Sequence, residues 1–219
     1  MIINIILTQP TSKVPVNNQH YINGYFHKLL GENNKWHDSF SDYAVSSLQG
    51  GHLVDGYLVF NDNPFITISS ENQEFINSVI NGALSSDAEV FGMKFKTLDF
   101  KDYNVNQYYD KVYTISPILI KKDGKKISVR DEEFLDTLTN NCKAKLKHKG
   151  IVDDTFKLEI RNLEKAKVKK IMVGDVFNIC SMVSLVVYGK KKTRSTLYNM
   201  GLGNSTGCGF GTVKISYCS

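Results

Sequence analysis

The sequence predicts an α+β protein, because strand-like and helix-like segments follow the order β-α-β-β-α-β twice along its 219 residues. A polar and aromatic segment at 103–110 lies between the two runs, and each run contains two segments with helical spacing of apolar residues. We therefore expect two tandem ferredoxin-like (RRM-like) βαββαβ domains at residues 1–108 and 109–219. The halves share this pattern and no clear sequence identity.

The first run opens with apolar residues at 2–8, which indicate a buried strand and not a signal peptide. Tyr21 to Leu30 has a wide apolar helical face. The glycines of 49–51 predict a turn between two strands, and Ser70 with Gln73 forms a capping box for the second helix. The expected strands are 2–8, 43–48, 56–60, 64–68 and 90–100, and the expected helices are 21–30 and 70–82.

The second run contains a hairpin-type turn at Lys122-Asp-Gly124-Lys and another turn at Gly174-Asp175. The segment 131–147 has inward apolar residues at helical spacing, and 190–200 is helix-like and precedes a stretch rich in glycine. The expected strands are 112–120, 156–160, 169–173, 176–188 and 213–215, and the expected helices are 131–147 and 190–200.

The composition is that of an ordinary globular protein, with 42% hydrophobic and 22% charged residues. The four cysteines show no C-x-x-C spacing, which argues against a zinc site, and free thiols indicate a reducing, cytoplasmic location. No apolar run is long enough to span a membrane. His20, His27, His37 and His52 lack acidic or cysteine partners at ligand spacing, so we expect no metal and no cofactor.

Basic residues gather in the C-terminal half, although the net charge is only +5. This asymmetry favours a polyanion partner, while any single cluster is also explained by solvated loops and helix faces. The clusters are Lys121, Lys122, Lys125 and Lys126; Lys143, Lys145, Lys147 and Lys149; Lys165, Lys167, Lys169 and Lys170; and Lys190, Lys191, Lys192 and Arg194.

Five of the 16 glycines lie between Gly201 and Gly211. Neither common phosphate loop fits, because the segment lacks Gly-Lys-Ser/Thr and a helix precedes the glycines where a dinucleotide loop has a strand. Two interpretations remain. The glycines form a tight helix-to-strand connection, or their N–H groups converge on a ligand.

Two motifs resemble a known family. Tyr198-x-x-Gly201-Leu-Gly203, followed by Ser205-Thr-Gly-Cys-Gly209-Phe-Gly211, resembles the C-terminal glycine-rich signature of the RAMP superfamily, and specifically of the CRISPR repeat-processing endoribonucleases. Near the N-terminus, Val14-Pro15-x-x-x-x-His20-Tyr21-Ile22-x-Gly24-Tyr25 resembles the first-helix signature of the same enzymes, and His37-Asp38 is similar to their Leu-His-Asp/Glu element. The resemblance covers residues 14–50 and 170–215.

The resemblance implies a metal-independent endoribonuclease that cuts precursor CRISPR RNA within its repeats. The 2′-OH would attack the phosphate and leave a 2′,3′-cyclic phosphate and a 5′-OH. His37 and His27 are the expected acid–base pair, without assigned roles, since histidine titrates near neutral pH. His27 lies opposite the apolar helix face together with His20, which is the reserve candidate.

The sequence departs from the family at the stabilising cation. Several members carry a lysine a few residues after the loop histidine, whereas Ser39, Ser41 and Asp42 stand there in this chain. Lys35 or Lys28 would then have to supply the positive charge.

The resemblance also implies an RNA-binding surface, with CRISPR repeat RNA as the partner. Other CRISPR effector subunits and a second copy of the chain are open as further partners. The residues expected to contact RNA are Lys165, Lys167, Lys169, Lys170, Lys190, Lys191, Lys192, Arg194, Gly201, Gly203, Ser205, Thr206, Gly207, Gly209 and Gly211.

Two other functions stay open at this point. A non-catalytic RAMP-type subunit of a CRISPR effector complex would bind RNA and would not depend on either histidine. An unrelated ferredoxin-like metabolic enzyme or ligand-binding protein would not need the double glycine signature, which argues against it.

Overall fold

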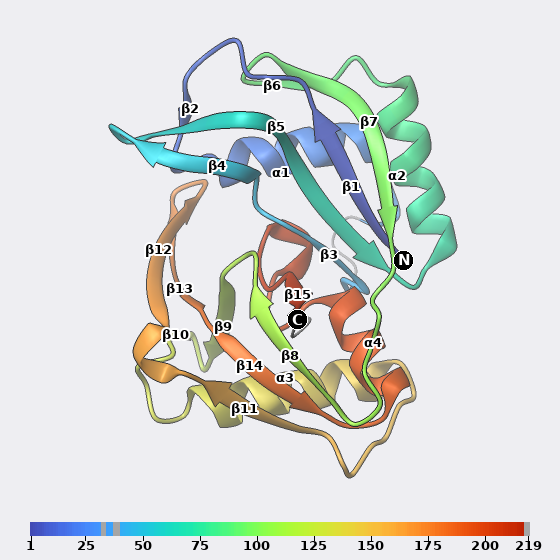
Figure 1. Ribbon diagram of the computed structural model, residues 1–219, viewed down its shortest axis with the longest axis vertical. Helices are drawn as coiled ribbons and strands as arrows, with labels where there is room; N and C mark the ends of the chain where they lie inside the picture. Colours follow the sequence, from blue (N-terminus) through green and yellow to red (C-terminus); the bar gives the residue numbers. More distant parts are fainter. Residues whose placement is uncertain (32–33, 37–39, 217–219) are drawn as a thin grey trace.

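The computed structural model describes residues 1–31, 34–36 and 40–216 (Figure 1). Its N-terminal half contains a sheet in which β1 lies between β5 and β7, with every neighbouring pair antiparallel. Strands β2, β3 and β4 also pair with β5, and β6 pairs with β7. The elements are β1 (Ile2–Leu7), β2 (Val14–Pro15), α1 (Gln19–Leu30), β3 (Tyr43–Val45), β4 (Gln49–Val54), β5 (Tyr57–Ser70), α2 (Gln73–Ser85), β6 (Glu89–Val90) and β7 (Met93–Lys101).

The C-terminal half contains two further antiparallel sheets, ordered β11-β14-β8-β15 and β10-β9-β13-β12. The β12–β13 hairpin rises along one side of the molecule toward the N-terminal half (Figure 1). The elements are β8 (Tyr109–Thr114), β9 (Ile118–Lys122), β10 (Lys125–Ile127), α3 (Phe134–His148), β11 (Lys157–Arg161), η1 (Leu163–Lys165), β12 (Lys167–Val173), β13 (Val176–Met182), β14 (Ser184–Tyr188), α4 (Lys191–Met200), η2 (Thr206–Cys208) and β15 (Val213–Ile215).

The predicted α+β class is confirmed, and the two halves share one strand order. In the N-terminal half the order is β3-β5-β1-β7, and in the C-terminal half it is β11-β14-β8-β15. In both halves the first strand lies between the third and the fourth of the β-α-β-β-α-β path, and a helix follows the first and the third.

Each half has its own hydrophobic core. The N-terminal core joins α1 and α2 to one side of the sheet, where Ile3 and Ile5 are fully buried. Burying such a side chain contributes about 1.5–3 kcal/mol. The C-terminal core joins α3 and α4 to the β8 sheet, and Tyr103 and Val105 pack against it. These two linker residues therefore belong with the second core, and the boundary after residue 108 remains a prediction.

The turn predicted at 49–51 is wrong. These residues belong to β4, and the turn to β5 lies at Asp55-Gly56, where both residues have positive φ (48° and 82°), as a type I′ hairpin requires. The glycines instead mark a register shift between Gln49 and Gly51. A Cβ at Gly51 would lie 2.8 Å from the ring of Phe60, so glycine is needed there for close packing.

The capping box predicted at Ser70 is also wrong, because β5 continues to Ser70. Asn72 caps α2 and accepts hydrogen bonds from the backbone N–H groups of Glu74 (3.0 Å) and Phe75 (3.2 Å). The Ser70 hydroxyl instead donates to the carbonyl oxygen of Asp42 at 3.1 Å.

Two predicted strands are each divided between two sheets. The segment 112–120 is interrupted around Pro117 and becomes parts of β8 and β9, because proline cannot donate to a strand ladder. The segment 176–188 is interrupted at Val183 and becomes β13 and β14. These breaks create the separate β10-β9-β13-β12 sheet. Within the described ranges, no helix combines the length and apolar character needed to cross a membrane.

Candidate catalytic loop and nucleic-acid interface

An aromatic cluster in the N-terminal half is centred on Phe75 of α2. The ring centroid of Phe75 lies 4.1 Å from that of Tyr43, 5.3 Å from Trp36 and 6.3 Å from Phe26. Each such pair contributes about 0.5–1.5 kcal/mol beyond simple burial. Phe26 directly precedes His27, and Trp36 directly precedes His37. The cluster therefore holds the residues before both candidate histidines against one ring.

The candidate catalytic residues differ in their surroundings. His37 lies outside the described residues. His27 on α1 is half-buried beside Phe26, and His20 is exposed next to Tyr21. Lys28 is exposed at the last turn of α1.

Lys35 is held against α2. Its ammonium pairs with the carboxylate of Glu74 and lies 4.8 Å from the ring centroid of Trp36. Both side chains of the ion pair are more than half exposed, so it contributes at most about 1 kcal/mol and Lys35 is free to exchange partners. Among the residues that the structure describes, no group of three or more His, Cys, Asp or Glu side chains is arranged to hold a metal ion.

Three of the four lysines near the β12–β13 hairpin converge on one groove. Lys165, Lys167 and Lys169 line a groove of about 370 Å³ together with Tyr113. Alternate residues of a strand point to opposite sides. Lys170 accordingly lies on the other face of β12, with its ammonium 4.2 Å from the ring centroid of Phe177.

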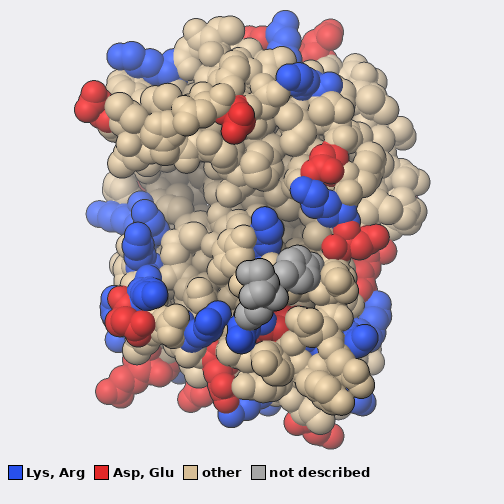
Figure 2. Space-filling view, in the orientation of Figure 1, with Lys and Arg blue, Asp and Glu red and all other residues tan. Residues whose placement is uncertain are grey.

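A second recess, of about 400 Å³, lies between the two halves. Its lining includes Asn4 and Thr67 from the N-terminal sheet and Tyr113 and Lys214 from the C-terminal sheet. Tyr113 is 37% exposed and lines both recesses, so the basic groove continues into the space between the halves. Figure 2 shows that this face is hollowed between its upper and lower parts, with many Lys and Arg side chains on the lower part.

Tyr113 is a candidate site residue that none of the sequence motifs includes. Tyr113 lies within the predicted strand 112–120. Strand alternation is the signal that could have singled it out, because Val112 and Thr114 of β8 are buried whereas Tyr113 is exposed. In the sheet it lies opposite Ser184 and Lys214, a juxtaposition that requires knowledge of the register.

The prediction that Arg194 contacts RNA is wrong, because its side chain is fully buried. One terminal nitrogen donates to Asp110 Oδ2 at 2.6 Å, and the other donates to the carbonyl oxygen of Asn106 at 2.7 Å. Its Nε donates to the carbonyl oxygen of Gly189 at 2.9 Å. Burial and the adjacent Asp110 carboxylate raise the pKa of Tyr198, whose hydroxyl donates to Asp110 at 3.0 Å.

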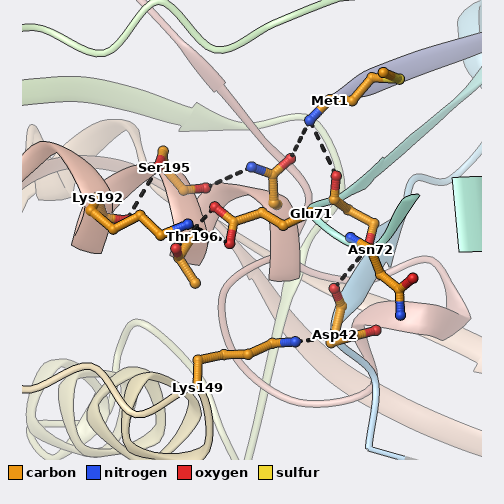
Figure 3. Close-up of polar contacts among 10 residues, drawn as sticks. Met1, Asp42, Glu71, Asn72, Lys149, Lys192, Ser195 and Thr196 are labelled. Carbon is orange, nitrogen blue, oxygen red and sulfur yellow. Dashed lines mark hydrogen bonds and ion pairs between the residues drawn. The ribbon is translucent and has the colours of Figure 1, made fainter. Parts of the chain in front are cut away.

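The three lysines at the start of α4 divide into two groups. Lys190 and Lys191 are exposed. Lys192 forms an ion pair with Glu71 at 2.9 Å, and Glu71 also accepts a hydrogen bond from Thr196 (Figure 3). Lys192 and Thr196 thus connect α4 of the C-terminal half to the end of β5. Among the residues that the structure describes, Lys190 and Lys191 form no ion pair with a carboxylate.

The first turn of α4 is fixed by Asp153, which precedes β11. Asp153 is almost completely buried and accepts hydrogen bonds from the Lys190 backbone N–H (2.7 Å) and the Thr193 hydroxyl (2.6 Å). Burial alone would raise the pKa of this carboxyl, but hydrogen bonds from Thr155, Thr193 and Lys190 hold it well below its usual range.

The glycine-rich loop is a packing joint and offers little surface to RNA. Its backbone pairs with the segment leading into β9: Asn204 N–H donates to the Leu119 carbonyl at 2.8 Å, and Gly211 N–H donates to the Pro117 carbonyl at 2.9 Å. The prediction of direct RNA contact is therefore wrong for its buried residues, and Ser205 is half-buried. The buried residues are Gly201, Gly203, Thr206, Gly207, Gly209 and Gly211.

The same loop connects the two halves. The Thr206 hydroxyl donates to the Tyr43 carbonyl at 3.1 Å, and a Cβ at Gly207 would lie 2.9 Å from the Tyr43 ring. Ser69 of β5 donates to the carbonyl oxygens of Tyr198 and Asn199 at 3.3 Å. The glycines thus permit the close approach between halves that side chains would prevent.

Lys145 of α3 was counted with the basic surface clusters, but it is buried. Its ammonium donates to the carbonyl oxygens of Met200 (3.3 Å) and Gly201 (3.0 Å), at the end of α4. Burial lowers the pKa of Lys145 to about 8. This lysine satisfies carbonyl groups that a helix end otherwise leaves without partners.

We expect Gly211→Ala to lower the free energy of unfolding by about 2–5 kcal/mol. Gly211 has φ +70°, and an added Cβ would lie 1.9 Å from the Leu202 carbonyl oxygen. The left-handed conformation costs about 1–2 kcal/mol and overpacking about 1–3 kcal/mol. Gly124→Ala is the matched control, because Gly124 has φ +76° and open space around it. Urea unfolding of both variants measures the difference, and equal losses would contradict the packing role.

The fold matches solved RAMP structures. A structure described as the characterization of a Cas6-related gene from Pyrococcus furiosus superposes with a TM-score of 0.85 at 23% identity, covering 100% of this chain and 99% of that one. A structure described as a RAMP protein binding different RNA substrates gives a TM-score of 0.85 at 21% identity, covering 99% of this chain and all of the other.

The family is shown by a sequence model. The model for the C-terminal region of CRISPR associated protein Cas6 matches residues 98–215, which is more than half of the chain. The chain therefore belongs to the Cas6 family. A Pyrococcus furiosus protein named as a CRISPR-associated endoribonuclease-like protein Cas6 is 29% identical over 180 residues, covering 73% of this chain and 71% of the relative.

Proposed function

We propose that this protein is a metal-independent endoribonuclease that cleaves CRISPR repeat RNA, with His37 and His27 as the acid–base pair. The observation that supports this most directly is the aromatic cluster. Phe75 contacts both Phe26 and Trp36, so the residues preceding the two histidines are held by one side chain although they are ten residues apart in sequence. Family membership supplies the class of reaction.

The proposed reaction is an internal transfer of a phosphodiester bond. One imidazole takes the proton from the 2′-OH, the 2′-oxygen attacks the adjacent phosphorus, and the bond from phosphorus to the 5′-oxygen breaks. The other imidazole, as imidazolium, gives its proton to the departing 5′-oxygen. The products are a 2′,3′-cyclic phosphate and a 5′-OH. Each proton transfer contributes about 10²–10⁴-fold to the rate.

The positive charge for the transition state would come from Lys35 or Lys28. Lys35 precedes His37 by two residues, and its exposed ion pair with Glu74 can be exchanged for a phosphate at little cost. Lys28 adjoins His27 on the exposed side of α1. Neither lysine follows the loop histidine in sequence, which distinguishes this chain from the family pattern.

The proposed RNA path runs from the basic groove into the recess between the halves. Lys165, Lys167 and Lys169 would contact phosphates, and Tyr113 offers a ring on which a base can stack. Of the 27 basic residues, 21 lie in residues 109–219, which hold 11 of the 22 acidic residues. Phosphate contacts position RNA without reading its sequence, so we expect affinity to fall steeply with salt.

We also infer that the two halves are tandem ferredoxin-like domains that divide near residue 108. The shared strand order, with the first strand between the third and fourth, supports this. Other CRISPR effector subunits and a second copy of the chain remain proposed partners.

The deciding experiment uses repeat RNA from the source organism in the presence of a chelator. We expect cleavage at one position in each repeat, with a cyclic phosphate at the new 3′ end, and no cleavage when the nucleotide before the cut carries a 2′-deoxy sugar. Tight binding without cleavage would identify the non-catalytic RNA-binding subunit instead. Chelator-sensitive cleavage, or neither binding nor cleavage, would overturn the proposal.

A further inference from the structure

The last turn of α3 presents basic residues on one face to the segment that follows His37. Lys145, His148 and Lys149 are spaced i, i+3 and i+4, which places them on the same side of the helix. Lys145 donates hydrogen bonds to carbonyl oxygens at the start of the glycine-rich loop. The ring of His148 stacks on Phe40 with centroids 3.9 Å apart, and Lys149 Nζ lies 2.8 Å from Asp42 Oδ2.

The pair between Lys149 and Asp42 joins the two halves of the molecule. Lys149 comes from the C-terminal half, and Asp42 lies just before β3 in the N-terminal half (Figure 3). The side chains of Lys149 and Asp42 are 30% and 16% exposed, so water and salt screen their attraction less than they screen the other lysine–carboxylate pairs of the surface.

The short segment from Phe40 to Tyr43 is held from several sides. Besides the contacts with α3, the Asp42 carbonyl accepts from the Ser70 hydroxyl at 3.1 Å, and the Tyr43 carbonyl accepts from the Thr206 hydroxyl at 3.1 Å. The Tyr43 ring stacks on Phe75. The contacts to α3 and to Thr206 come from the C-terminal half, so this half helps to fix a segment whose sequence begins three residues after His37.

We propose that Lys149 is a positioning residue for the catalytic loop: by pairing with Asp42, it fixes the segment that follows His37 in the orientation that cleavage requires. This inference rests on the proposed endoribonuclease function. Rates of positioned reactions are sensitive to small displacements, and a misplacement of about 1 Å lowers a rate by about 10²-fold.

Two roles for Lys149 make different predictions. A phosphate-binding lysine would change RNA affinity, and its loss could not be repaired by a second substitution at Asp42. A positioning lysine would change the rate at saturating RNA, and exchanging the two charges would restore the pair. Lys147 is the matched control, because it is an exposed lysine on the same turn, whereas the ion pair with Asp42 is made by Lys149.

The test compares Lys149→Glu, Asp42→Lys, the double variant with both changes, and Lys147→Glu. We measure single-turnover cleavage at saturating repeat RNA, the RNA dissociation constant, and amide hydrogen exchange over residues 40–46. Each of the first two variants should cleave about 10–100-fold more slowly than native. The dissociation constant of Lys149→Glu should match that of Lys147→Glu, and the double variant should recover most of the lost rate and the native exchange.

Two results would overturn the inference: a double variant no faster than the single ones, or a cleavage rate of Lys149→Glu equal to that of Lys147→Glu. A native chain that does not cleave repeat RNA at all would instead overturn the proposed function, and the positioning role in cleavage with it. Hydrogen exchange would then report separately whether the pair still docks the segment.

Discussion

Replacing Arg194 with methionine is expected to lower the free energy of unfolding by about 3–5 kcal/mol, because the change leaves Asp110 without its cationic partner in a fully buried site. The guanidinium also donates to the carbonyl oxygens of Asn106, Gln107 and Gly189, so the change removes the donors that tie the linker to α4. Urea unfolding followed by tryptophan or tyrosine fluorescence measures the loss.

A control variant and a double variant test whether the loss of stability comes from the unpaired buried charge. Arg161→Met removes an exposed arginine and should stay within about 0.5 kcal/mol of native. The double variant Asp110→Asn with Arg194→Met removes both charges and should recover part of the loss, since the unpaired charge is the main cost. If the Arg194→Met protein were as stable as native and bound RNA more weakly, the result would contradict the buried structural role and indicate that Arg194 contacts RNA.

Replacing His37 with alanine is expected to reduce the cleavage rate at saturating RNA by about 10²–10⁴-fold, because one of the two proton transfers loses its side chain. His27→Ala should cause a loss of the same order. RNA affinity should change little in both variants, since the proposed phosphate contacts lie on Lys165, Lys167 and Lys169. Single-turnover kinetics over a range of pH measures this, and each variant should lose one limb of the pH profile.

His52→Ala is the matched control, because His52 is an exposed histidine on β4 away from the aromatic cluster. It should cleave at the native rate. If His37→Ala abolished cleavage and His27→Ala cleaved at the native rate, His37 would remain an acid–base residue and His20 would become the candidate for the second one. Native cleavage by both single variants would remove histidine from the mechanism.

The sequence was sufficient for the α+β class and for the location of all four long helices, since apolar periodicity depends on neighbouring residues alone. It was insufficient where a strand passes from one sheet to another. The breaks around Pro117 and at Val183 depend on which strands pair, and pairing joins segments far apart in the chain. The prediction of a turn at 49–51 was wrong for a similar reason: glycine is required at position 51 because the ring of Phe60 on the neighbouring strand packs against it.

The candidate site was also predicted only in part, because several of its residues have partners far away in the sequence. Lys165, Lys167 and Lys169 do lie on one exposed groove, and strand alternation explains why Lys170 does not. Arg194 and Lys145 look like surface charges in a one-dimensional pattern. The carboxylate that pairs with Arg194 is 84 residues away in sequence, and the Met200 carbonyl that accepts from Lys145 is 55 residues away. The glycine-rich signature identified the family correctly, while most of its residues are buried in packing between the two halves.

The joint made by the glycine-rich loop also bears on how the chain is built. In the first half, the Ser69 hydroxyl and the Tyr43 carbonyl are hydrogen-bonded by residues far along the chain, at Tyr198, Asn199 and Thr206. A nascent chain emerging from the ribosome would therefore carry a first half whose Ser69 hydroxyl and Tyr43 carbonyl lack these partners until residues 198–206 have been synthesised. The contacts that this loop makes between the two halves can form only after residues 198–206 have left the exit tunnel, so the first half reaches its final packing later than its own synthesis.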